Sequence, residues 1–228
     1  MQDSPDSAQA LAEAGTEVPA GQIGREQLAR QLNEFETFAQ RVRPWISGAL
    51  LPPFSGSLSI ALETGLWRLD ATFTDLRSEG LVRYRDRNAS GTEYLSAWLH
   101  QLVLCAMQPA SSRSAVRWLL RDTSIHFDPP DNPLEILRSL MQLYAQGLCA
   151  PLRFFPKTAW AYASNEWSHA KALDTWRPHE YAGTSEQQDP WIRLAFRGQP
   201  DPLEHDFEGF DTCARLVFEP LIAHLRHD

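Results

Sequence analysis

The fold is decided by residues 65–107, GLWRLDATFTDLRSEGLVRYRDRNASGTEYLSAWLHQLVLCAM, which predict two strands followed by a helix. Apolar and polar residues alternate from Trp67 to Phe73, which is the period of a half-buried strand. The segment LVRYR, residues 81–85, predicts a second strand, and residues 76–80 predict the turn of a hairpin between the two. The helix that follows would cover this hairpin with an apolar stripe at helical spacing, made of Tyr94, Leu95, Trp98, Leu99, Leu102 and Val103.

The predicted hairpin is the kind of place where a Mg²⁺-dependent nuclease holds its metal. Such a site needs an acidic residue on one strand and an acid and a lysine two residues apart on the next, because side chains two apart share a face. Asp70 supplies the first carboxylate, but the pair reads Arg83 and Arg85. Arginine has no lone pair to offer a cation. We therefore expect no metal and a degenerate catalytic site at these three positions.

The arginines of the second strand have other possible partners. Asp70 is expected to form an ion pair with Arg83 or Arg85 across the hairpin. Together with Arg87, these arginines are candidate DNA-binding residues, because a guanidinium group binds phosphate through two parallel hydrogen bonds. The alternative is that this face is buried against a partner subunit, and the sequence leaves both interpretations open.

A second group of basic residues follows the helix. Arg113, Arg117 and Arg121 are four residues apart, and on a strand that spacing would place them on one face. Arg113 and Arg117 are therefore further DNA-binding candidates. The alternative is an ordinary solvated face.

Composition predicts a soluble, aromatic-rich domain. The chain has 228 residues, of which 43% are hydrophobic, enough for one sizeable core. No apolar run approaches the roughly 20 residues of a membrane span, and the start of the chain lacks a signal-peptide pattern, so we expect a cytoplasmic protein without a membrane partner. Cys105, Cys149 and Cys213 are far apart and are expected to be reduced core thiols.

Charge argues against nonspecific coating of DNA, because the formal net charge is −8. The charge is uneven, however, and residues 41–130 carry ten arginines against eight acidic residues. This excess is consistent with phosphate binding or with base composition, since Lys157 and Lys171 are the only lysines in the chain.

Other catalytic and cofactor motifs are missing from the sequence. The seven histidines show no HExxH or equivalent spacing, so they are expected to be surface or interface residues. No GxxxxGK[ST] loop occurs, so ATP binding is not expected.

The rest of the chain is predicted to be mostly helical. Residues 1–18 are small and acidic and are expected to be a disordered leader. Strands are predicted at 58–62, 116–120 and 125–127, and helices at about 28–43, 133–147, 157–164, 166–176, from 189, and 206–224. Two of these helices start with a cap residue followed by proline, Asn132–Pro133 and Asp189–Pro190. A polar loop is expected at 177–188.

Six segments together resemble one known family. They are WRLDATFTDL, LVRYR, YLSAWLHQLVLCA, PLRFFPKTAWAYA, DPWIRLAFRG and FDTCARLVFEPLIAHL. The set resembles the C-terminal domain of the gamma subunit of exodeoxyribonuclease V, the RecC family. The resemblance covers nearly everything from Val18 to the C-terminus.

The resemblance implies an α/β (α+β) fold of the PD-(D/E)XK nuclease-like kind, with a mixed central sheet flanked by helices and a helix-rich C-terminal half. Residues 19–228 would form this domain. Active relatives carry a Gln and a Tyr four apart on the central helix, whereas Gln101 is followed by Cys105 in this chain. Members resembling this chain are noncatalytic, which agrees with the arginines at the expected metal site.

The resemblance also implies which protein complex and which process the domain belongs to. The domain would work with RecB-like and RecD-like subunits in a heterotrimer that acts on DNA ends in break repair and recombination, with Chi recognised through upstream domains that this chain lacks. It would bind no cofactor itself, since the partner subunits use ATP and Mg²⁺. Two rivals remain open: a standalone Mg²⁺-dependent nuclease that uses Asp70 with Glu63 or Asp75, and a protein scaffold without DNA affinity.

Overall fold

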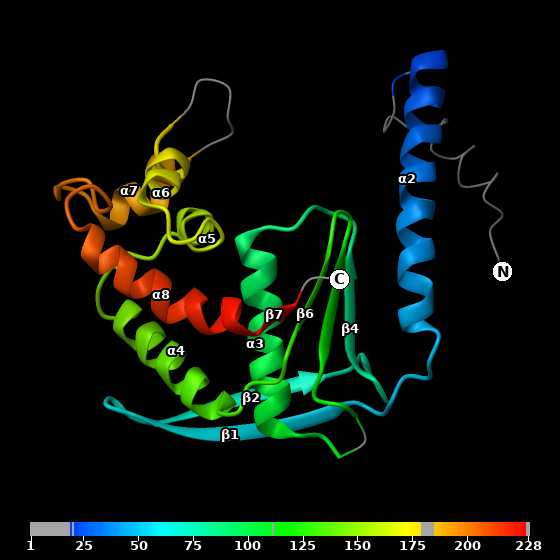
Figure 1. Cartoon of the computed structure of the whole chain (residues 1–228), viewed down its shortest axis with the longest axis horizontal. Helices are drawn as coiled ribbons and strands as arrows, with labels where there is room; N and C mark the ends of the chain where they lie inside the picture. The colour runs from blue at the N-terminus through cyan, green and yellow to red at the C-terminus, as the bar shows by residue number, and fades with distance from the viewer. Residues whose placement is uncertain (1–18, 20, 111, 179–184, 227–228) are drawn as a thin grey trace. The chain divides into compact units, whose positions relative to one another are not determined.

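The computed structural model describes residues 19, 21–110, 112–178 and 185–226 (Figure 1). The chain forms two compact units, Met1–Ser47 and Gly48–Asp228. The first unit contains helix α2 (Gln22–Ile46). The prediction that this helix ends before Pro44 is wrong. Pro44 lies in its last turn, where the missing N–H group costs a single hydrogen bond. The expected disordered leader lies outside the described residues.

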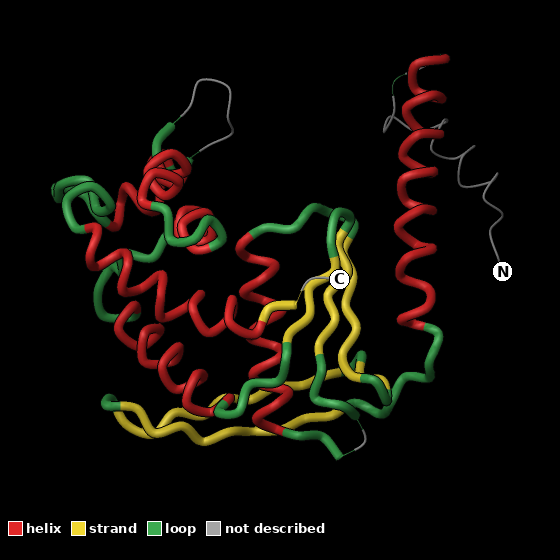
Figure 2. The backbone as a smooth tube through the Cα atoms, in the orientation of Figure 1, coloured by secondary structure: helices red, strands yellow, loops and turns green. Residues whose placement is uncertain are grey.

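The larger unit contains two β-sheets, whose strands are yellow in Figure 2. The smaller sheet is an antiparallel hairpin of β1 (Phe54–Leu62) and β2 (Gly65–Phe73). Gly65, at the end of its turn, has a φ of 121°, a conformation that glycine adopts without steric cost. Exposure alternates along both strands, which confirms the predicted half-buried pattern.

The larger sheet is mixed. Its strands are, in spatial order, β3 (Leu76–Arg77), β4 (Gly80–Arg85), β5 (Val116–Leu120), β6 (Ser124–Phe127) and β7 (Leu225–Arg226). β4 and β5 are parallel, and the other neighbours are antiparallel. Parallel neighbours need a long connection, which helix α3 (Gly91–Met107) supplies. The chain is thus a mixed α/β protein, as predicted.

The predicted hairpin between residues 67–73 and 81–85 is wrong. Both segments are strands, but β2 pairs with β1, and β4 pairs with β3 and β5. Alternation of apolar residues determines which face of a strand is buried, and it does not determine the partner. The segment before β2 alternates equally well and is joined to it by a shorter turn. As a result, Asp70 does not lie opposite Arg83 or Arg85.

The described residues of the C-terminal half form helices as predicted. They are α4 (Pro133–Gly147), α5 (Pro156–Ala163), α6 (His169–Trp176), α7 (Pro190–Ala195) and α8 (Phe207–His224), with a 3-10 turn at Glu186–Gln188. The Asp189 side chain caps α7 and accepts a hydrogen bond from the amide of Trp191 at 2.8 Å. Residues 179–184 of the expected polar loop lie outside the described part of the chain. None of the described helices is long and apolar enough to cross a membrane.

Helix α3 is at the centre of the larger unit (Figure 1), where it contacts β1, β5, β6, α4, α5 and α8. Trp98 and Leu102 are fully buried, as the apolar stripe predicted, whereas Leu99 is 37% exposed. The indole of Trp98 packs against the rings of Phe127 and His224, at centroid distances of 5.0 and 5.3 Å. Helix α3 therefore connects the sheet to α8, the last helix.

A second part of the core is aromatic. The ring of Phe155 lies 4.4 Å from that of Trp176, 6.0 Å from that of Phe196 and 6.1 Å from that of Phe210, centroid to centroid. These residues come from PLRFFPKTAWAYA, DPWIRLAFRG and the two helices α6 and α8. Three of the segments quoted for the family resemblance, the third being FDTCARLVFEPLIAHL with Phe210, thus meet in one cluster and hold the C-terminal helices together.

Candidate nucleic-acid interface between β4 and α3

The two β4 arginines lie on the face of the sheet that α3 covers. In the β4–β5 register, Leu81 pairs with Val116, Arg83 with Trp118 and Arg85 with Leu120. Trp118 is buried, and its ring lies 5.7 Å from the guanidinium carbon of Arg83 and 5.3 Å from that of Arg85. Both guanidinium groups therefore lie beside an aromatic ring, where cation–π attraction favours them.

Arg83 contacts two further groups. Its Nε donates to Oδ2 of Asp75 at 2.9 Å, and its Nη1 donates to Nε2 of His100 at 2.7 Å. About a third of each side chain of the Arg83–Asp75 pair is exposed, at 30% and 35%. The acidic partner is thus Asp75, just before β3, and the predicted pair between Arg83 and Asp70 is wrong.

Arg85 and Arg87 share one carboxylate. Nη1 of Arg85 lies 3.5 Å from Oε1 of Glu93, and Nη2 of Arg87 binds the same oxygen. The side chain of Glu93 is buried, at 1% exposure, while those of the two arginines are half exposed, at 50% and 53%. The other oxygen of Glu93, Oε2, is buried and has no hydrogen-bond partner within the described residues. Two positive charges here face one negative charge.

Glu93 was missed as a site residue in the sequence. It stands three residues after Ser90, a spacing that normally predicts a capping box with the side chain turned back to the cap residue. Ser90 makes no side-chain cap bond, and the carboxylate turns to the arginines. Its place in the first turn of α3 suits a negative charge, because the helix dipole is positive there.

Asp70 belongs to the other sheet. Its carboxylate accepts a hydrogen bond from the Ser57 hydroxyl and pairs with Arg68, whose Nε lies 2.8 Å from Oδ1. These two contacts lower the pKa of Asp70. The structure therefore separates Asp70 from the β4 arginines with which it was grouped.

Arg113 and Arg117 do not join the cluster around Glu93. Arg113 precedes β5 and pairs with Glu79 at 2.9 Å. Arg117 lies within β5 on the opposite face from Trp118, and its Nη1 donates to the hydroxyl of Ser124 at 3.2 Å. Arg121 follows the strand and pairs with Asp86. The predicted row on one strand face is wrong, since β5 is too short to hold all three arginines.

The remaining candidate ligands have structural partners. Glu63 exchanges hydrogen bonds with Gln142 on α4, at 3.3 Å through its amide and 3.2 Å through its carboxylate. Gln101 connects α3 to β5, because its amide donates to the carbonyl of Ser114 and accepts from the amide of Val116, both at 2.8 Å. Among the described residues, no group of three or more His, Cys, Asp or Glu is arranged to hold a metal ion.

The three cysteines are unpaired, as predicted, but only Cys105 is buried. Burial raises the pKa of Cys105, and that of the partly buried Cys213. Cys149 is exposed just after α4, so the prediction of a core thiol is wrong there. Of the histidines, His179 and His227 lie outside the described residues.

Comparison with known proteins agrees with the resemblance seen in the sequence. The family described as the RecC C-terminal domain matches residues 1–167, about three quarters of the chain, including β4 and α3. The RecBCD enzyme subunit RecC of Escherichia coli (strain K12) is 25% identical over 194 residues, which cover 83% of this chain and 17% of that protein. The chain thus spans less than a fifth of the length of this relative. By the extent of the family match, the chain belongs to the RecC C-terminal domain family.

Proposed function

We propose that this domain is a noncatalytic, nuclease-like module of a RecBCD-type helicase/nuclease that acts in double-strand-break repair and recombination. Its roles would be to dock RecB-like and RecD-like subunits and to guide DNA strands. Family membership and the relative named as a RecBCD subunit support this setting. The observation that carries the proposal is that the guanidinium groups of Arg83, Arg85 and Arg87 are each bound to a carboxylate.

The arrangement of charges supports the noncatalytic part. In a PD-(D/E)XK-like fold, acids on adjacent strands converge on a cation and a phosphate. In this chain Asp75 precedes β3, and β4 follows with Arg83 and Arg85 on one face. Asp75 is bound by Arg83, and Glu93 by Arg85 and Arg87. A divalent cation would meet positive charge at close range, and arginine has no lone pair with which to bind it.

The same arrangement supports contact with DNA. Arg85 and Arg87 are half exposed and share one carboxylate oxygen, so a positive charge remains at the surface. A backbone phosphate can accept parallel hydrogen bonds from such groups. Because the whole chain carries a formal net charge of −8, this contact would be local and would not coat DNA. We propose that ATP and Mg²⁺ are used by the partner subunits alone.

Binding to a forked DNA duplex tests the DNA part. Removing both arginines leaves the buried Glu93 charge uncompensated, so the informative variant is R85A/R87A/E93Q, which neutralises the whole group. We expect this variant to bind at least tenfold more weakly at low salt. The slope of log K against log salt concentration should become shallower by about 0.9 for each lost phosphate contact. R138A removes an exposed arginine that pairs with Glu135 on α4, and it should bind like the wild type.

Two results would contradict parts of this proposal. Equal affinity of R85A/R87A/E93Q and R138A for forked DNA would remove the β4–α3 cluster as the contact. Failure to recover RecB-like and RecD-like subunits in a pull-down with the folded domain would contradict the docking role. DNA affinity absent at every salt concentration, with the pull-down positive, would instead favour a protein scaffold.

A further inference from the structure

A pocket of about 310 Å³ lies beside α7 and the turn that follows it. Arg193 and Arg197 line this pocket, and both are exposed. Arg193 lies in α7, and Arg197 lies in the turn that follows this helix. The inward positions belong to Ile192 and Phe196, which pack against the aromatic core. The two arginines are therefore not needed for packing.

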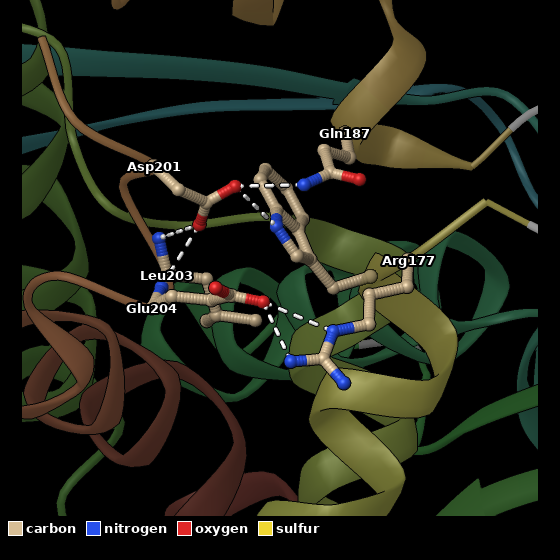
Figure 3. Close-up of polar contacts among 6 residues, drawn as sticks. Arg177, Gln187, Asp201, Leu203 and Glu204 are labelled. Carbon is tan, nitrogen blue, oxygen red and sulfur yellow. Dashed lines mark hydrogen bonds and ion pairs between the residues drawn. The ribbon is translucent and has the colours of Figure 1, made fainter.

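Neither guanidinium group has a hydrogen-bond or ion-pair partner within the described part of the chain. This is unlike the nearby Arg177, which pairs with Glu204 at 2.7 Å (Figure 3). Two positive charges that line the same pocket repel each other. An anion held between Arg193 and Arg197 would turn this repulsion into attraction.

The acidic residue that lines the pocket is already engaged. The carboxylate of Asp201 accepts four hydrogen bonds (Figure 3), from Nε1 of Trp176 at 3.0 Å, Nε2 of Gln187 at 2.8 Å, and the amides of Leu203 at 3.0 Å and Glu204 at 2.9 Å. These donors satisfy both carboxylate oxygens without using either arginine. Asp201 therefore holds Trp176 and Gln187 in place beside the pocket and leaves the guanidinium groups of Arg193 and Arg197 available to a ligand.

We propose that this pocket binds a phosphate group through Arg193 and Arg197. A phosphate has enough oxygens to accept paired hydrogen bonds from two guanidinium groups at once. The two oxygens of a carboxylate accept such a pair from one guanidinium group. Gln199 also lines the pocket, and its side-chain amide could act as a further donor, since its backbone N–H already donates to the carbonyl of Phe196. The phosphate would be free in solution or part of a nucleic-acid backbone. For inorganic phosphate we expect a dissociation constant that is roughly millimolar, given two charge-assisted contacts at a solvated site.

The test is an NMR titration of the arginine Nε–Hε signals of the whole ¹⁵N-labelled chain with sodium phosphate, against sodium chloride at equal ionic strength. We expect the Nε–Hε signals of Arg193 and Arg197 to shift with added phosphate until the shift saturates. The first signal should be missing in R193A and the second in R197A. Each substitution should weaken phosphate binding at least tenfold, while R138A, at a paired arginine on α4, should leave it unchanged. Shifts that never saturate, or unchanged affinity in R193A and R197A, would overturn the proposal.

A second titration with a short single-stranded oligothymidylate identifies the source of the phosphate. Tighter binding than that of inorganic phosphate, lost in R193A, supports a nucleic-acid backbone. Saturable shifts with inorganic phosphate alone support a free phosphate ligand. If neither compound shifts these signals, the pocket is not a phosphate site. With inorganic phosphate, R85A/R87A/E93Q should give the same shifts at Arg193 and Arg197 as the wild type, so that titration is separate from the test of the β4–α3 cluster.

Discussion

Arg83 donates a hydrogen bond to Nε2 of His100, 2.7 Å away, and this contact determines the protonation state of the imidazole ring. A guanidinium group only donates, so Nε2 must accept. The ring proton is then on Nδ1, which donates to the carbonyl of Ser96 at 2.6 Å. Burial lowers the pKa of His100, and the positive charge of Arg83 lowers it further.

This relationship predicts a loss of stability in weak acid. The unfolded chain takes up the His100 proton near its ordinary pKa of 6.5, and the folded chain does so only at lower pH. The free energy of unfolding should therefore fall as the pH drops from about 6.5 to the pKa of the folded state. Urea unfolding over this range would measure it, and His100→Gln should flatten that part of the profile. An NMR titration that places His100 at or above its ordinary pKa would contradict the assignment.

The Glu93 cluster predicts strong non-additivity. R85A/R87A leaves the buried carboxylate of Glu93 without a counter-charge, which should lower the free energy of unfolding by about 1–3 kcal/mol. This loss is smaller than that for a fully buried ion pair, because the two arginines are half exposed to solvent. Adding Glu93→Gln to that variant should recover most of the loss. Denaturant unfolding of the four proteins in the cycle measures the coupling. Losses that simply add would show that the three side chains do not act as a unit.

Glu186 predicts a long-range effect on α5. Its carboxylate, 8% exposed as a residue, accepts hydrogen bonds from the amides of Lys157 at 3.0 Å and Thr158 at 2.8 Å. Because Pro156 has no N–H, these are the first two donors of that helix. Glu186→Ala should cost about 1–2 kcal/mol and speed amide exchange at Lys157 and Thr158. Unchanged exchange at both amides would rule out the cap.

The aromatic cluster predicts a contrast between two large side chains. Phe155 is 1% exposed and packs against three rings, so Phe155→Ala should cost about 3–5 kcal/mol. Trp191 is 77% exposed on α7, and Trp191→Ala should change the free energy of unfolding by less than about 0.5 kcal/mol. Thermal or urea unfolding compares them. Similar losses for both would mean that the cluster is not the centre of the C-terminal half.

Local patterns in the sequence predicted most of the elements. Cap and proline signals predicted the helices that begin at Pro133 and Pro190, and alternation predicted the buried face of β2. These features depend on neighbouring residues, so sequence alone reveals them. The partner of a strand depends on chain geometry, and for that reason β2 was assigned to the wrong sheet.

The candidate site was predicted only in part. Arg83 and Arg85 were identified because two-residue spacing on a strand places side chains on one face. Their carboxylate partners were not, since Asp75 and Glu93 reach the arginines from a turn and from the first turn of a helix. The pairing follows from how α3 crosses the sheet, which no local pattern encodes.

The central proposal is that guanidinium groups stand where a nuclease would hold its cation. Its most direct test is incubation of the purified chain with Mg²⁺ and linear DNA, with D75A and E93A as matched variants. The account predicts that the DNA stays intact with all three proteins. Metal-dependent cleavage by the wild type that is abolished in D75A or E93A would contradict it.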